Sequence, residues 1–490
     1  MFNPEFLVGD TWGFPGLAVE HIETHAAHVF LCGYRAFKIK KDVKLPYLDF
    51  STVALRRAVL QRELAINTTF APDIYLEVIE KKGEPVLVMQ RFEASAMLSS
   101  LVGHGGIADQ LSARLAEAVA DAHAKAAVMG SAGAEVMAGL GAQLSKAFAD
   151  SPDIFPSAAA LEFNALHENA LRRLGPLLNQ RGESGLVRRC HGDMHCANIV
   201  IIAGQPVLFD AIEFSEKIAT IDVLYDLAFL LMDLLAHGEA RAANHVLNRY
   251  LHLRRAEEDL SGLAALPLFL ATRAGVRALV TADLAHELAA SAAARHRTTA
   301  LDYFKACIDF LKPRKPELIC IGGLSGTGKS TLAASLAPAM GSPPGALHIR
   351  SDIERKVLAG VGELERLPPH YYSSLNSQKV YDAMLDRAGR ALSAGMPVVM
   401  DAVFAVASER LAAQGLAERC GAKFRGFWLE ADAGLLKARV AKRVGDASDA
   451  TPDVVESQSS YDLGDISWTR IDATGSPEAL QAKVLGLAAG

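Results

Sequence analysis

Eight consecutive residues of this chain have the types and spacing that bind phosphate. The run Gly323-Leu-Ser-Gly-Thr-Gly-Lys-Ser330 fits the pattern G-x-x-x-x-G-K-[ST]. Glycines let backbone N–H groups turn inward around phosphate oxygens, and the N-terminus of a following helix adds partial positive charge. Lys329 would then reach the β- and γ-phosphates of ATP, and the Ser330 hydroxyl would ligate Mg²⁺.

The flanking residues supply the elements that this loop needs. Leu318–Ile321 is an apolar run typical of a buried strand, and Ser330–Ala337 is rich in helix formers. The alternative is a glycine-rich surface turn with an incidental lysine, but the strand–turn–helix context favours a nucleotide site. We expect the following residues to contact the nucleotide: Gly323, Ser325, Gly326, Thr327, Gly328, Lys329, Ser330 and Thr331.

A second cluster, His191-Gly-Asp-Met-His-Cys-Ala-Asn198, carries a different chemistry. Asp193 and Asn198 are five residues apart, and Asp210 ends an apolar strand seventeen residues after Asp193. In kinases an Asp accepts the proton of the substrate hydroxyl, an Asn five residues later holds Mg²⁺, and a further Asp after a hairpin holds Mg²⁺ again. The alternative is a polar turn with a helix-capping Asp and an unrelated Asp at the end of a strand.

Residues upstream of this cluster follow the order of a kinase N-lobe. Strands are predicted over 28–33, 35–40 and 85–90, with a helix over 55–70 that carries Glu63. Lys38 and Lys40 both lie on one face of a strand, so either could hold the α/β-phosphates. Glu63 would pair with that lysine, although an ordinary exposed helix position is an equal alternative.

The stretch from about 20 to 300 resembles the aminoglycoside phosphotransferase and choline kinase-like group, whose catalytic loop reads His-Gly-Asp-x-x-x-x-Asn. That resemblance implies that Asp193 is the catalytic base, that Asn198 and Asp210 are Mg²⁺ ligands, and that Lys38 is the phosphate lysine. No G-x-G-x-x-G motif precedes Lys38 to cover the phosphates. His191 and His195 have no third residue at zinc-ligand spacing, so we expect them to be structural.

After the phosphate-binding loop, strands and helices alternate. Strands are predicted over 318–321, 346–350, 397–401, 424–430 and 469–473, the pattern of a parallel sheet covered on both faces. This part, from roughly 316 to 488, resembles small P-loop kinases related to gluconate kinase, chloramphenicol phosphotransferase and polynucleotide kinase. The resemblance places Asp352 as a substrate-facing base, with helix capping as the alternative.

Two further features of this part fit a P-loop kinase. Asp401 ends an apolar strand, the Walker B pattern in which a carboxylate holds Mg²⁺. Arg439 and Arg443 are four residues apart on a predicted helix and would face one side. In related kinases a lid arginine neutralises charge on the transferred phosphoryl group. We expect Arg443 in that role and Arg439 near the nucleotide, and a solvated basic helix face is the alternative.

Length and composition indicate an ordinary multidomain globular protein. The chain has 490 residues, 50% hydrophobic and 22% charged, with a net charge of −6 that disfavours tight binding to duplex nucleic acid. The six cysteines have no zinc spacing and indicate a reducing compartment. No signal peptide is evident, and apolar stretches such as 227–236 are too short for a bilayer, so we expect a cytoplasmic protein without membrane contact.

Two prolines and three basic residues in Lys312-Pro-Arg-Lys-Pro316 predict a linker. The predicted fold is therefore a two-lobed α+β kinase-like domain over 1–311, with an N-lobe over about 1–92 and a C-lobe over about 93–311. An α/β P-loop domain with a parallel sheet follows over 317–490. As a whole the chain looks like bacterial fusions of an aminoglycoside-phosphotransferase-type domain to an AAA-type ATP-binding domain.

The leading hypothesis is an ATP- and Mg²⁺-dependent, bifunctional kinase acting on small-molecule alcohols. One alternative is a nucleotide-gated regulator, in which one domain binds ATP without turnover and sets the state of the other. Another is a nucleic-acid 5′-end kinase in the C-terminal half, which would need a basic groove near Arg350, Arg355, Lys356, Arg439 and Arg443. The sequence specifies neither the phosphate acceptor nor the oligomeric state.

Overall fold

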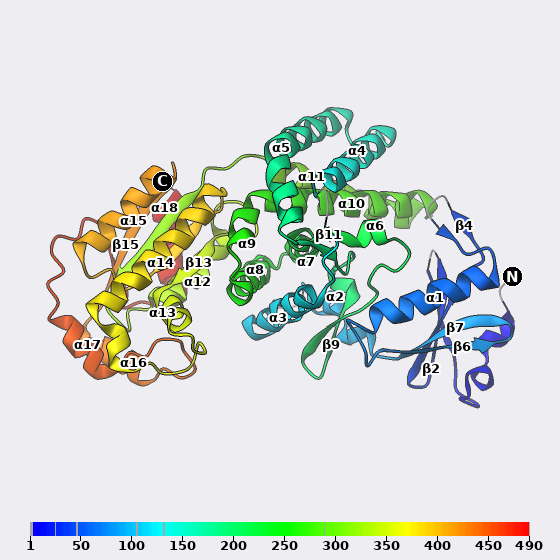
Figure 1. Cartoon of the computed structure of the whole chain (residues 1–490), viewed down its shortest axis with the longest axis horizontal. Helices are drawn as coiled ribbons and strands as arrows, with labels where there is room; N and C mark the ends of the chain where they lie inside the picture. Colours follow the sequence, from blue (N-terminus) through cyan, green and yellow to red (C-terminus); the bar gives the residue numbers. More distant parts are fainter. Residues whose placement is uncertain are drawn as a thin grey trace. The chain divides into compact units, whose positions relative to one another are not determined.

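The structure is a computed structural model that describes residues 3–24, 26–45, 48–103, 106–130, 133–288 and 290–489 (Figure 1). The chain forms two compact units. The first comprises Met1–Gln143 and Gly175–Glu239, and the second comprises Leu144–Leu174 and Ala240–Gly490. The unit boundaries fall inside two long helices, α4 (Gly133–Asp150) and α5 (Ser157–Glu183).

The first unit begins with a five-stranded antiparallel sheet in the order β1-β2-β3-β7-β6. Its strands are β1 (Glu20–Glu23), β2 (Ala27–Cys32), β3 (Arg35–Lys40), β6 (Tyr75–Lys81) and β7 (Glu84–Gln90). Helix α1 (Val53–Asn67) packs on β6 and β7. Smaller elements of this region are η1 (Pro4–Leu7), η2 (Gly9–Trp12), β4 (Lys44–Leu45) and β5 (Leu48–Asp49).

Strand β3 separates apolar from charged side chains because neighbouring residues of a strand point to opposite faces. Phe37 and Ile39 are buried on one face, where the ring of Trp12 stacks on Phe37 at 4.3 Å between centroids. Lys38 and Lys40 point to the other face, the one that α1 covers. The alternation therefore delivers two lysines to the same side as the helix.

The rest of the first unit is mainly helical. It contains η3 (Ala94–Ala96), α2 (Leu98–Leu101), α3 (Asp109–Lys125), η4 (Cys196–Asn198), α6 (Glu216–Ala219) and α7 (Val223–Ala236). Two antiparallel pairs join β8 (Val187–Arg189) to β11 (Thr220–Asp222) and β9 (Ile199–Ile202) to β10 (Gln205–Leu208). Helix α7 is buried along most of its length, yet it carries Asp226 and Asp233. Buried carboxylates need hydrogen-bond donors, and both find them in the loop before β9.

The second unit contains helices α8 (Ala240–Arg254), α9 (Glu257–Gly262), η5 (Leu263–Ala265), α10 (Leu266–Glu287) and α11 (Ala290–Leu311). Helices α10 and α11 pack along one another. Four phenylalanine rings from α4, α5, α11 and the α4–α5 connection cluster beside them: Phe148, Phe155, Phe163 and Phe304. Because these four rings are buried against one another, they stabilise the packing of the helices that carry them.

One helical segment of the described residues, Glu257–His286, is long and apolar enough by composition to cross a membrane. The expectation that all apolar stretches are too short was therefore wrong on length. Its most apolar window has a mean hydropathy of 1.5, and 67% of that window is buried inside the fold. Burial of this extent is typical of a core helix, so the segment is weak evidence for a membrane span.

A five-stranded, all-parallel sheet in the order β13-β14-β12-β15-β16 forms the centre of the remaining second unit. Its strands are β12 (Glu317–Gly323), β13 (Leu347–Arg350), β14 (Val398–Asp401), β15 (Lys423–Glu430) and β16 (Thr469–Asp472). These match the five predicted strands to within two residues. Because the strands are parallel, their carboxyl ends meet at one edge, where β12 leads into the glycine-rich loop and β14 ends at Asp401.

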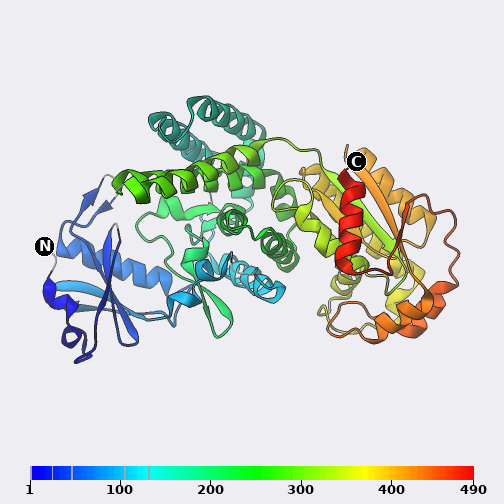
Figure 2. The same ribbon diagram turned by 180° about the vertical axis from the view of Figure 1, so that it is seen from behind.

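Helices cover both faces of this sheet. Figure 1 shows α14 in front of the strands, and Figure 2, seen from behind, shows the C-terminal helix α18 in front. Helix α14 contacts α15, and α18 contacts α12. The helical elements are α12 (Lys329–Leu336), η6 (Ala337–Ala339), α13 (Ser351–Ala359), η7 (Pro369–Tyr372), α14 (Ser374–Ser393), α15 (Ala407–Arg419), α16 (Ala433–Ala441), α17 (Pro452–Ser459) and α18 (Pro477–Ala489).

The predicted linker at 312–316 lies in the irregular segment between α11 and β12. The compact units group α8–α11 with the parallel sheet, whereas the sequence predicts them in the N-terminal domain. The domain boundary therefore stays a prediction. Limited proteolysis that cuts at 312–316 and leaves two folded fragments would support it.

Candidate active sites

The first candidate site is built around a buried ion-pair network at the sheet face of the first unit. The Lys38 Nζ lies 2.6 Å from Oε1 of Glu63 and 3.1 Å from Oδ1 of Asp210. Burial lowers the pKa of Lys38, but the attraction of Asp210 and Glu63 outweighs it and raises the pKa well above its usual value. Lys38 is therefore held as a cation beside Asp210, as a phosphate-binding lysine would be.

Lys40 shares the same glutamate. Its Nζ lies 2.7 Å from Oε2 of Glu63 and 2.8 Å from Oε1 of Glu213. Burial would raise the pKa of Glu63, but Lys38 and Lys40 lower it to about 2, so this carboxylate stays charged. Among the described residues, Lys38 contacts Asp210 and Lys40 does not, which favours Lys38 over Lys40 for the phosphate role.

The catalytic-loop residues are positioned by two carboxylates of α7. Asp226, fully buried, accepts hydrogen bonds from the backbone N–H groups of His191 (3.1 Å) and Gly192 (2.9 Å). Asp233 accepts one from the backbone N–H of Cys196 at 2.9 Å. A charged acceptor makes such bonds strong, so α7 fixes both ends of the loop.

Asp193 and Asn198 are in direct contact within this loop. The Asn198 Nδ2 donates to the carbonyl oxygen and to Oδ2 of Asp193, both at 2.9 Å. This arrangement leaves the amide oxygen of Asn198 as a ligand for a metal ion. The Asp193 side chain is 39% exposed and is accessible to an acceptor molecule.

Asp210 is brought to the same place by backbone contacts. Phe209 N donates to the carbonyl oxygen of Asn198 at 3.0 Å, and the backbone N–H of Asp210 donates to the Tyr75 hydroxyl at 3.0 Å. Asp210 has a φ of 60°, a left-handed conformation that is uncommon for a residue other than glycine and is found at functional sites. The structure thus brings Lys38, Glu63, Asn198 and Asp210 together with Asp193.

The two loop histidines, which the sequence predicts to be structural, both have partners within the protein. His191 donates from Nε2 to the carbonyl oxygen of Phe209 at 3.0 Å, and burial lowers its pKa. His195 accepts at Nδ1 from the backbone N–H of Ala197. One group in the described residues has metal-ligand types within 4.8 Å, namely His123, Cys190 and Asp226, all buried. Neither loop histidine belongs to it, and Asp226 is already engaged by the catalytic loop.

The second candidate site is the glycine-rich loop after β12. Gly323, Gly326 and Gly328 have φ values of 138°, 87° and 88°, which only glycine adopts without strain. A Cβ on Gly326 would lie 2.7 Å from the carbonyl oxygen of Leu436, so the loop has no space for a side chain there. The glycines therefore give the turn a backbone conformation in which N–H groups can face a phosphate.

The predicted magnesium ligands of this site converge. The Ser330 hydroxyl donates to Oδ1 of Asp401 at 2.8 Å, and Asp401 is only 2% exposed. Burial would raise the pKa of Asp401, but a hydrogen bond from His348 Nε2 at 2.5 Å and the charges of His348 and Arg350 lower it. A hydroxyl and a charged carboxylate at one point fit Mg²⁺, which prefers oxygen ligands.

Lys329 lies at the same carboxyl edge of the sheet. Its Nζ donates to the carbonyl oxygen of Leu324 at 2.9 Å. Burial lowers its pKa to about 8, although the charges of Asp401 and Asp352 oppose the shift. Bound phosphate would add negative charge beside Lys329 and favour its charged form.

This pKa predicts a pH dependence of ATP binding. Bound phosphate oxygens favour the charged lysine, so ATP binding above pH 8 must be accompanied by proton uptake. We expect the apparent ATP affinity of this site to fall about tenfold from pH 7 to pH 9, since a lysine with a pKa of about 8 loses its proton over that range. Calorimetry in buffers of different ionisation enthalpy would measure the proton taken up, and a flat affinity profile would contradict the assignment.

The charges of Arg350, Asp352 and Arg443 lie close enough to Lys329 to affect its pKa. Arg350 NH2 lies 2.5 Å from Oδ1 of Asp446 and 3.9 Å from Oδ2 of Asp352. Helix α16 ends at Ala441, so the prediction that Arg439 and Arg443 share one helix is wrong for Arg443. The chain turns there, and the backbone N–H of Arg443 donates to the carbonyl oxygen of Val440. The Nη1 atom of Arg443 lies 3.9 Å from Oδ1 of Asp446.

The segment between α16 and α17, which carries the predicted lid arginine Arg443 and is called the lid below, is anchored by Asp449. This carboxylate accepts hydrogen bonds from Lys356 Nζ (2.6 Å), the Tyr372 hydroxyl (2.5 Å) and the backbone N–H of Leu367 (3.0 Å). Burial would raise the pKa of Asp449, but these donors lower it. These three hydrogen bonds hold the lid to α13 and to the segment that follows it.

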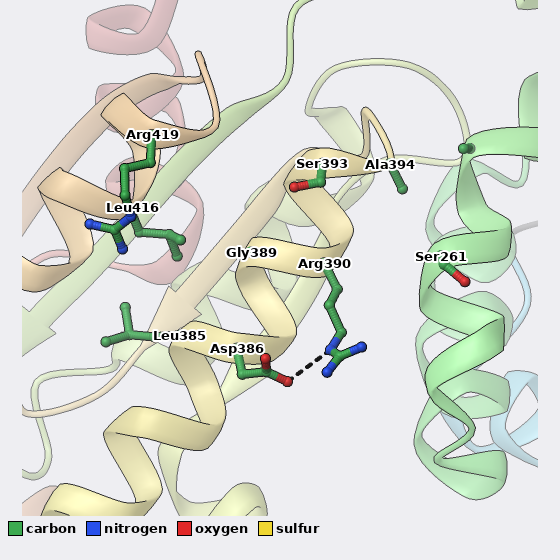
Figure 3. A pocket seen from close by; sticks show the side chains of 10 residues that line it. Ser261, Leu385, Asp386, Gly389, Arg390, Ser393, Ala394, Leu416 and Arg419 are labelled. Carbon is green, nitrogen blue, oxygen red and sulfur yellow. Dashed lines mark hydrogen bonds and ion pairs between the residues drawn. The ribbon is translucent and has the colours of Figure 1, made fainter. Parts of the chain in front are cut away.

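A cavity of about 580 Å³ in the second unit lies apart from the candidate catalytic residues (Figure 3). It is lined mainly by α14 and α15, with Ser261 and Ala264 on its other side. Asp386 and Arg390 form an ion pair within α14 at its rim. None of the residues predicted for nucleotide, metal or acceptor binding lines it.

Sequence reasoning missed several residues of both sites. Glu213 and Tyr75 complete the network around Lys38 and Asp210, and His348 contacts Asp401. Of these residues, only Glu213 could have been found from the sequence, because Asp210-Ala-Ile-Glu213 places a second carboxylate three residues after the first.

Fold and site together define the class of protein. The first unit has an antiparallel sheet followed by a mainly helical part, as the two-lobed α+β prediction requires. The second unit has an all-parallel sheet with the glycine-rich loop after β12, as predicted for an α/β P-loop domain. Residues 318–461 match the family model described as AAA domain.

The chain is also similar to a relative over nearly its whole length and to parts of solved structures. An "Uncharacterized protein" of Mycobacterium tuberculosis (strain H37Rv) is 28% identical over 478 residues, covering 93% of this chain and 92% of the relative. A gluconokinase from Sinorhizobium meliloti 1021 is 20% identical, over 36% of this chain and 93% of its own, with a TM-score of 0.27. A choline/ethanolamine kinase family protein from Mesorhizobium loti is 18% identical, over 59% and 88%, with a TM-score of 0.37.

Proposed function

We propose that this protein is a Mg²⁺- and ATP-dependent phosphotransferase with two kinase-like sites that act on small-molecule alcohols. The observation that carries the proposal is the Lys38 ammonium group, which lies between Glu63 and Asp210 at 2.6 and 3.1 Å. A structural ion pair needs one carboxylate, whereas a phosphate site needs a lysine held beside a metal-binding carboxylate. The Asp193–Asn198 contact supplies the remaining groups.

In the first unit, Asp193 would accept the proton of the acceptor hydroxyl. As that oxygen bonds to the γ-phosphorus, the bond from phosphorus to the β,γ-bridging oxygen breaks, and ADP leaves with the electron pair. Mg²⁺, when bound, neutralises charge on the β- and γ-oxygens. Asn198 and Asp210 would hold it, and Lys38 would orient the α- and β-phosphates.

In the second unit, Lys329 would neutralise the β- and γ-phosphates, while Ser330 and Asp401 would hold Mg²⁺. Asp352 would accept the proton of the acceptor hydroxyl. Arg350 and Arg443 lie close enough to Lys329 to affect its pKa, so they would stabilise the transferred phosphoryl group. These arginines would have to leave Asp446 to do so, which couples catalysis to a movement of the lid.

A screen with labelled ATP and a panel of sugars, amino alcohols and polyols tests the proposal. It should be run on the full chain and on Asp193→Asn and Lys329→Ala variants. If one variant loses phosphate transfer to a given alcohol and the other keeps it, that alcohol is assigned to the site that carries the first substitution. ATP consumption that neither substitution lowers, for any accepted alcohol, would refute a kinase function.

The nucleic-acid kinase alternative has less support. Three of the five basic residues expected to form its groove are engaged by carboxylates of the lid, Arg350 and Arg443 by Asp446 and Lys356 by Asp449. Their charges are therefore offset, and the salt-dependent attraction of a phosphate backbone would be reduced. Binding of single-stranded RNA or DNA at low salt would revive this alternative.

A further inference from the structure

Helix α8 covers the edge of the parallel sheet. Strand β13 is the edge strand, and no strand of the described residues pairs with its outward backbone groups. The Nδ2 atoms of Asn244 and Asn248 donate to the Ala346 carbonyl oxygen at 3.0 and 3.1 Å, and Oδ1 of Asn248 accepts from the backbone N–H of His348 at 2.8 Å. Two side chains of one helix thus replace the hydrogen bonds of a missing strand.

The residue held by Asn248 reaches the P-loop site. His348 Nε2 donates to Oδ2 of Asp401, whose other oxygen accepts from the Ser330 hydroxyl. Asn248, His348, Asp401 and Ser330 therefore form an unbroken chain of hydrogen bonds from α8 to the proposed magnesium ligands. The family model that matches the P-loop domain starts at residue 318 and does not include α8.

We propose that His348 is a positioning residue for the magnesium site of the P-loop unit, and that Asn248 of α8 holds it in place. This inference rests on the proposed nucleotide-binding function of that site. His348 fixes the orientation of Asp401, so that one carboxylate oxygen faces the metal position beside Ser330. Helix α8, far before the glycine-rich loop in sequence, is then part of the nucleotide site.

The physical basis is the role of outer hydrogen bonds in metal sites. Partners that orient a metal ligand typically change metal affinity about 10- to 100-fold when they are removed. Metal-free nucleotide binding depends instead on Lys329 and the backbone of the loop, which His348 does not contact. A positioning role therefore predicts a change in the Mg²⁺ requirement with little change in ATP affinity in EDTA.

The test is a Mg²⁺ titration of ATP-analogue binding, using a non-hydrolysable analogue and the full chain. A Lys38→Ala substitution removes the lysine of the other proposed nucleotide site, so that the signal reports the P-loop site. We expect His348→Ala to raise the half-saturating Mg²⁺ concentration at least about tenfold. His348→Gln keeps an N–H donor and should recover much of that loss. The spectrum of bound Mn²⁺ gives an independent measure of the same site.

Asn244 and Asn248 provide a matched control on one helix. Both bond the Ala346 carbonyl, but only Asn248 bonds the N–H of His348. Asn248→Ala should raise the Mg²⁺ requirement about fivefold, the factor for one ordinary hydrogen bond, and Asn244→Ala should not. Equal effects of the two substitutions, or an unchanged requirement in both His348 variants, would overturn the inference. Loss of analogue binding in EDTA in the parent would instead refute the proposed function.

Discussion

Asp193→Asn should lower the rate of phosphoryl transfer in the first unit by about 10²- to 10⁴-fold, the usual contribution of a general base. The substitution preserves shape but removes the oxygen that would accept the hydroxyl proton. The backbone of the loop is held by Asp226 and Asp233, so the loop should keep its conformation. Single-turnover transfer from labelled ATP to an alcohol accepted by this site is the appropriate measurement.

The affinity for ATP shows whether Asp193→Asn removes only the general base or also disrupts the fold of the site. It should change little in Asp193→Asn, because Lys38 and Asp210 keep their contacts. Asp121→Asn is a suitable control, since Asp121 is 62% exposed on α3 and pairs with Lys125 of the same helix. Transfer at the parental rate in Asp193→Asn would show that another group takes the proton.

Lys329→Ala should weaken ATP binding at the P-loop by about 10²- to 10³-fold, because charge-assisted hydrogen bonds to two phosphates are lost. The same change should not lower the thermal stability of the ligand-free protein. Burial lowers the pKa of Lys329 to about 8, which means that the folded protein disfavours its charge. Calorimetric binding and a thermal melt of each variant would test both expectations.

Lys437→Ala is the matched control for this lysine. Lys437 lies on α16, is 38% exposed and pairs with Glu456. Its removal should leave both ATP affinity and melting temperature close to those of the parent. If Lys329→Ala lowered stability and left ATP affinity unchanged, Lys329 would be a structural residue and the P-loop assignment would fail.

The parts of the sites that could be predicted are those whose chemistry is local in sequence. The phosphate-binding loop needs eight neighbouring residues, and its flanking strand and helix are strong local signals. The Lys38–Glu63 pair spans 25 residues, but a known order of strand, helix and strand connects them. Asp193, Asn198 and Asp210 were recognised together because their joint spacing is rare.

The parts that were missed depend on contacts between distant segments. Asn248 and His348 are 100 residues apart, and Tyr75 and Asp210 are 135 apart. No periodicity or motif indicates which side chain an edge strand or a buried backbone N–H will meet. Strand β6 was missed for a local reason, because Glu77 and Glu80 interrupt the apolar pattern that signals a strand.

The coverage of β13 by α8 has a consequence for self-association. Bare strand edges recruit strands from other molecules, and proteins normally block them. At the opposite edge, β16 is only four residues long and its Arg470 pairs with Glu430, which discourages such pairing. A fragment cut at 312–316 would lack Asn244 and Asn248, so its β13 edge would be open to a second copy. Aggregation of the isolated P-loop part would then result from the loss of α8 at the β13 edge and not from instability of the sheet.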